Sequence, residues 1–124
     1  MNIIISNSSD IPIYQQIVDH IRQNIVDGQI STGDPLPSIR SLAKELSVSV
    51  ITTKKAYEVL EEQGYVKTIA GKGSFVSKQS AALAKEHKAS TLEQHLLEAI
   101  DIASELDMGK DEVKELLDVL YMEV

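Results

Sequence analysis

The chain has 124 residues, which is enough for one compact domain with an appendage but not for two full-sized domains. It lacks cysteine, a stretch long enough to span a membrane and a signal-peptide pattern, so we expect a cytoplasmic protein without disulfides. The net charge of −7 lies entirely in residues 79–124, which hold four basic and eleven acidic residues, whereas residues 1–78 hold eight of each. The first part is therefore compatible with a nucleic-acid partner, and the acidic part should face away from DNA.

A first helix is predicted after Asp10, an acidic capping candidate, with Pro12 near the first helical position. Its apolar residues recur at helical spacing: Tyr14, Ile17, Val18, Ile21 and Ile25. Gly28 ends it, and the following loop carries a turn signal at residues 33–35. The isoleucines at positions 3–5 predict either a short strand or disordered apolar residues.

Two helices joined by a short turn come next. The second helix is predicted over about Ser38–Leu46, with the Ser38 hydroxyl as its N-cap. Residues 47–49 form a tight turn, and a third helix follows to about Gln63, before Gly64. The inner face of this third helix is expected to be Thr53, Ala56, Tyr57 and Leu60.

The periodicity then changes to that of a hairpin. Residues 65–69 and 74–77 are β-rich and are joined by a glycine-containing tip at residues 70–73. From Lys78 onward the pattern is helical again, with room for a kink near Ser90 and a break at residues 107–110. We therefore predict an α+β fold, a winged helix-turn-helix over residues 1–78 followed by a helical dimerisation tail over residues 79–124.

Two short helices cannot bury all the apolar residues of the tail against each other. We therefore expect a second copy to cover them, so that the protein is a homodimer. The residues predicted for the dimer interface are Leu92, Leu96, Leu97, Ile100, Leu116, Leu117 and Leu120.

Residues 11–77 resemble the DNA-binding domain of the GntR family of bacterial regulators. The motifs that carry the resemblance, in order, are LPSIRSLA from Leu36, VS from Val48 followed by Thr52, AYEVLE from Ala56, QGYV from Gln63 and GKGSFV from Gly71. The opening PIYQQI from Pro12 and the length of the tail are similar to the YtrA subfamily, whose members carry a short helical dimerisation tail. This resemblance implies a repressor.

The candidate DNA contacts have two sources. By helical spacing, Val50, Ile51, Lys54 and Lys55 lie on the outer face of the third helix, and Lys72 stands between two glycines at the hairpin tip. The resemblance adds or supports Ser38, Arg40, Ser49, Thr52, Lys54, Gly71, Lys72 and Gly73. Val50 and Ile51 replace the arginine or polar residues of many family members, so they can contact bases only through apolar groups.

Sequence-specific binding of a two-fold symmetric operator by a homodimer is therefore the leading hypothesis. One alternative is a winged helix that binds proteins, which the apolar pair Val50 and Ile51 favours. Another is a sensor with a small-molecule effector, of unknown identity, between the tail helices. His87 and His95 lack a third ligand nearby, and no nucleophile with a base appears, so we expect no metal, no cofactor and no enzyme.

Overall fold

The computed structural model describes residues 1–124 and contains two compact units, Met1–Glu86 and His87–Val124. The helices and strands are α1 (Ile13–Val26), α2 (Ile39–Leu46), α3 (Val50–Glu62), β1 (Val66–Ile69), β2 (Gly73–Val76), α4 (Ser80–Glu105) and α5 (Lys110–Glu123). The strands form one antiparallel hairpin with Val66 opposite Val76 and Ile69 opposite Gly73. The predicted α+β class and the winged helix-turn-helix order are confirmed.

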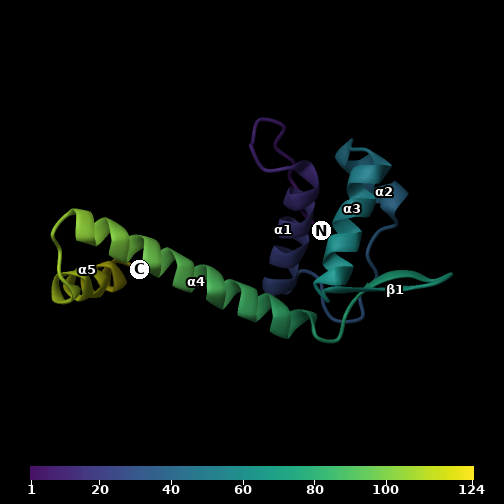
Figure 1. Ribbon diagram of the computed structural model, residues 1–124. Coiled ribbons are helices and arrows are strands. Elements are labelled where there is room, and N and C mark those ends of the chain that lie inside the picture. Colours follow the sequence, from purple (N-terminus) through teal and green to yellow (C-terminus); the bar gives the residue numbers. More distant parts are fainter. The chain divides into compact units, whose positions relative to one another are not determined.

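The first unit is built around α1 and α3, which lie side by side, with α2 packed on α3 (Figure 1). The four residues predicted for the inner face of α3 are all buried. They meet the apolar face of α1, where Ile17, Val18 and Ile21 are fully buried. Burial of these faces stabilises the unit and leaves the opposite face of α3 free for contact with other molecules.

Hydroxyl groups cap the two helices of the helix-turn-helix. The Ser41 amide donates to the Ser38 hydroxyl at 3.1 Å, and the Thr52 amide donates to the Ser49 hydroxyl at 3.0 Å. Between them Ser47 adopts the left-handed conformation, with φ 55°, which closes α2 and reverses the chain. The predicted Ser38 cap is confirmed, and the second cap fixes where α3 begins.

The start of α1 differs from the prediction. Pro12 precedes the helix and no side chain caps it, so the expected cap by Asp10 is wrong. Instead the Gln16 amide group donates to the carbonyls of Ser6 and Ile11, each at 2.9 Å, and its oxygen accepts from the Ser6 amide at 2.8 Å. Ile3 and Ile5 pack against the core, and no strand forms in the N-terminal segment.

The loop before α2 pairs with the hairpin. The Gly33 amide donates to the Val76 carbonyl, the Val76 amide to the Asp34 carbonyl, and the Leu36 amide to the Ser74 carbonyl, each at 2.9 Å. The sequence predicted only a turn here. In the structure, this segment also lies beside β2 and pairs with it like a short third strand. The hairpin and the start of α2 are therefore joined by backbone hydrogen bonds.

The boundary of the first unit lies later than the predicted position after Lys78. The first turns of α4 belong to this unit, because Ala84 is 1% exposed and Leu83 packs against the core. The Tyr65 hydroxyl also donates to the Leu83 carbonyl at 3.3 Å. Apolar residues at the start of α4 thus complete the winged-helix core.

The helix α4 continues without interruption through Thr91, past the position of the expected kink. The Thr91 hydroxyl donates to the His87 carbonyl one turn earlier at 3.0 Å, a bond that lets threonine stay within a helix. The predicted break is confirmed at Asp107, where φ is 56°, and α5 then lies near the last turns of α4 (Figure 1). None of the helices is both long and apolar enough to cross a membrane.

The second unit buries very little of its own surface. Ala103 is its one buried residue, and Met108 and Val113 are half-buried. The six leucines and one isoleucine predicted for a dimer interface are 44–61% exposed in the single chain. Their apolar surface is therefore available to another molecule.

Candidate nucleic-acid interface

The first turn of α3 presents an apolar pair to solvent. Val50 is 47% exposed and Ile51 is 82% exposed. The flanking hydroxyls are already engaged, since Ser49 donates to the Thr52 hydroxyl at 2.8 Å while accepting from its amide. The two predicted hydroxyl contacts therefore lie at the helix front, but their first role there is to cap it.

The two lysines of α3 have different neighbours. The Lys54 ammonium lies 4.0 Å from a carboxylate oxygen of Glu58, and both side chains are well exposed. Such a surface pair is weak, so a phosphate can replace the carboxylate as its partner. The Lys55 ammonium lies 4.0 Å from the centre of the Tyr14 ring on α1, a cation–π contact that draws it toward α1.

Residues from α2 and the hairpin line a common hollow of about 530 Å³. Four predicted contacts meet here: Ser38 and Arg40 at the start of α2, and Lys72 and Gly73 on the hairpin. Arg40 and Lys72 are exposed, and neither side chain forms a hydrogen bond or an ion pair within the chain. Two cations beside a helix N-terminus form a site of positive potential suited to a phosphate group.

Buried groups fix the positions of the elements that line this hollow. The Tyr57 hydroxyl on α3 donates to the Pro37 carbonyl at 2.7 Å, which ties the start of α2 to α3. Burial, and secondly the Glu45 carboxylate, raise the pKa of Tyr57, so the hydroxyl remains a donor at neutral pH. The sequence placed Tyr57 in the core but gave no sign of this bond, because its acceptor is a backbone carbonyl twenty residues away.

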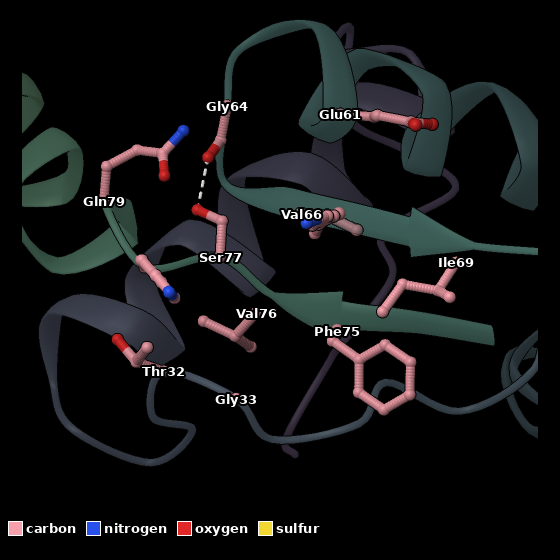
Figure 2. A pocket seen from close by; sticks show the side chains of 12 residues that line it. Thr32, Gly33, Glu61, Gly64, Val66, Ile69, Phe75, Val76, Ser77 and Gln79 are labelled. Atoms are coloured by element: carbon pink, nitrogen blue, oxygen red, sulfur yellow. Dashed lines mark hydrogen bonds between the residues drawn. The ribbon is translucent and has the colours of Figure 1, made fainter. Parts of the chain in front are cut away.

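A second hollow, of about 680 Å³, lies at the base of the hairpin and contains none of the predicted DNA contacts (Figure 2). Val66, Ile69, Phe75 and Val76 supply most of its apolar lining. The Ser77 hydroxyl donates to the Gly64 carbonyl across its edge (Figure 2). The Glu61 carboxylate and two lysines, Lys67 and Lys78, also line it.

The predicted site residues thus fall into three places. Ser49, Val50, Ile51, Thr52 and Lys54 form the front of α3, while Lys55 lies beside α1. Ser38, Arg40, Lys72 and Gly73 line the hollow, and Gly71 stands at the hairpin tip with φ 76°. The left-handed conformation explains glycine at the tip, since other residues rarely adopt it.

Comparison with known proteins agrees with this geometry. Residues 13–76, which cover all of α1 to β2, match the family described as bacterial regulatory proteins, gntR family. The chain belongs to the GntR family. It is therefore a DNA-binding transcriptional regulator and not an enzyme, and the resemblance inferred from the sequence motifs is confirmed.

Individual relatives extend the similarity into the tail. The HTH-type transcriptional repressor YtrA of Bacillus subtilis is 33% identical over 92 residues, which cover 74% of this chain and 71% of the relative. A transcriptional regulator from Oenococcus oeni has a similar structure, with a TM-score of 0.84, 26% identity and coverage of 94% of this chain and 97% of that one. The predicted similarity to YtrA is thus confirmed.

A third comparison includes DNA. The DNA-binding domain of AraR, crystallised in complex with its operator ORR3, has a TM-score of 0.53 and 27% identity, covering 62% of this chain and 93% of that one.

Proposed function

We propose that this regulator is a cytoplasmic repressor that binds a two-fold symmetric operator as a homodimer. The observation that carries the proposal is the hollow that brings Arg40, at the start of α2, together with Lys72 on the hairpin. Its two cations have no partner within the chain, so each is available to DNA, Arg40 to a base edge and Lys72 to a phosphate or the minor groove.

Each contact has a distinct task in this proposal. The front of α3 enters the major groove, where Lys54 and Arg40 contact guanine and the hydroxyls of Ser38, Ser49 and Thr52 bind backbone phosphates. Lys72, between Gly71 and Gly73, approaches phosphates or the minor groove. Lys55 adds a phosphate contact when it leaves the Tyr14 ring. In this proposal the contacts to bases determine sequence specificity, and the contacts to phosphates position the protein on the DNA backbone.

The tail supplies the second half of the operator complex. Its exposed leucines would be covered by the same residues of a second copy, and a two-fold dimer reads a palindromic operator with equal half-sites. A groove of about 430 Å³ between the end of α4 and α5, lined by Ile100, Ala103, Met108 and Val113 among others, provides a place for an apolar side chain of the partner. The printed description of the YtrA relative as a repressor supports repression, and a repressor of bacterial genes works in the cytoplasm.

The test is selection of bound fragments from random DNA, followed by affinity measurements across salt concentrations. We expect a palindromic consensus, two chains per site and an affinity that falls steeply with salt. Arg40→Ala should cost about 1–3 kcal/mol and relax one position of each half-site, whereas Lys72→Ala should weaken all sequences similarly and reduce the salt slope by roughly one per half-site contact.

Lys44→Ala, which removes an exposed cation at the other end of α2, is the matched control and should leave the consensus unchanged. A consensus without symmetry, or one chain per site, would contradict the homodimer. An absence of salt-dependent binding to any DNA fragment would instead support the alternative of a protein-binding winged helix.

A further inference from the structure

A strongly exposed apolar side chain stands at the front of the recognition helix. Ile51 is 82% exposed in the first turn of α3, and Val50 beside it is 47% exposed. Residues in the first turn of a recognition helix are the ones that reach base edges in the major groove. A large apolar group at that position has no partner in the free protein.

The polar side chains around Ile51 already have partners within the free protein. Ser49 and Thr52 bond to each other, and Lys54 pairs with Glu58. Lys55 lies over the Tyr14 ring. DNA that contacts this turn can therefore bury the Ile51 side chain without breaking a hydrogen bond or an ion pair of the free protein.

We infer that Ile51, assisted by Val50, recognises the C5-methyl group of a pyrimidine in the major groove. This inference rests on the proposed operator binding and names the chemistry that one part of the same site would recognise. The C5-methyl of thymine is the apolar group that a base pair presents in the major groove, and 5-methylcytosine carries the same group at the same place. The shared ligand is thus a methyl group, with two bases as its source.

Recognition of a methyl group can be distinguished by experiment from recognition through hydrogen bonds. Removing the methyl from thymine leaves every hydrogen-bonding group of the base pair in place, so only contact with an apolar side chain is lost. Burial of one methyl-sized group corresponds to about a fourfold change in affinity. Adding the methyl to cytosine at the same position should recover a similar amount.

The experiment uses the full-length protein and the consensus fragment selected from random DNA. Each thymine is replaced in turn by uracil, and then the best position by cytosine and by 5-methylcytosine. We expect about a fourfold loss for uracil at one position per half-site, and about a fourfold gain of 5-methylcytosine over cytosine at that position. In Ile51→Ala both differences should disappear, while Ile4→Ala, an equally accessible isoleucine in the N-terminal segment, should retain them.

The outcomes separate this inference from the proposed function. Failure to select any consensus would overturn the operator proposal itself. A clear consensus at which every uracil replacement leaves the affinity unchanged would overturn the methyl contact alone. A uracil effect that persists in Ile51→Ala would also overturn it, because another side chain would then hold the methyl. An effect with uracil but none with 5-methylcytosine would assign thymine as the source.

Discussion

The two units of this chain use similar apolar residues in opposite ways. In the winged-helix unit Ile17, Leu42 and Leu60 are almost completely buried, whereas in the tail Leu92, Leu97 and Leu106 are at least half exposed. The charges differ as well, since residues 1–86 hold nine basic and nine acidic residues while residues 87–124 hold three and ten. One unit buries its apolar residues internally, and the other leaves them exposed in the single chain.

This difference indicates that the two units have different functions. A unit with a closed core can present an unpaired cationic hollow to DNA without losing stability. An acidic unit with open apolar faces avoids the phosphate backbone and is suited to contact with a second copy, provided that burial outweighs the repulsion between the acidic residues.

The strongest test of this comparison is truncation after Glu86, at the boundary between the units. We expect a folded monomer whose operator affinity is about 10²–10⁴-fold lower, because the two half-sites are no longer bound by linked domains. Sedimentation and DNA titration measure the two effects.

A second truncation after Lys78 serves as the control. It also removes Leu83 and Ala84, which complete the core, so it should melt at a lower temperature than the longer fragment. A longer fragment that still sediments as a dimer would contradict the role given to the tail.

A smaller effect should separate a core leucine from a tail leucine. Leu60→Ala should lower the free energy of unfolding by about 2–5 kcal/mol at any protein concentration, because it leaves a cavity in a closed core. Leu97→Ala should instead shift the monomer–dimer equilibrium, so its effect on the melting temperature should vanish on dilution. Equal effects at all concentrations would mean that the tail folds as part of the monomer core.

The smallest expected effect concerns the bond that connects the two DNA-facing elements. Tyr57→Phe removes the donor to the Pro37 carbonyl and should cost about 1 kcal/mol of stability. The folded state raises the pKa of Tyr57, so its contribution is present below about pH 10 and is lost as the pH rises further. Denaturant unfolding of both proteins at pH 8 and pH 10.5 should show the difference shrinking at the higher pH, and a constant difference would contradict it.

Local signals in the sequence predicted the helix-turn-helix well. The cap at Ser38, the buried face of α3 and the hairpin follow from periodicity and from residue types that act on adjacent backbone groups. The helix α4 continues past the position of the expected kink, and the Thr91 hydroxyl bonds within that helix, an option that residue type alone does not reveal. The cap expected from Asp10 was wrong, since Pro12 precedes α1 and no side chain caps that helix.

By itself, the sequence determined the order of the elements, the family motifs and the separation of charge between the two parts of the chain. Only the tertiary structure decided that Arg40 and Lys72, thirty-two positions apart, line the same hollow, and that Tyr57 and the loop before α2 hold its walls. The physical reason is that periodicity reports which face of an element is apolar. It carries no record of which backbone carbonyl, in another part of the chain, a buried donor will reach.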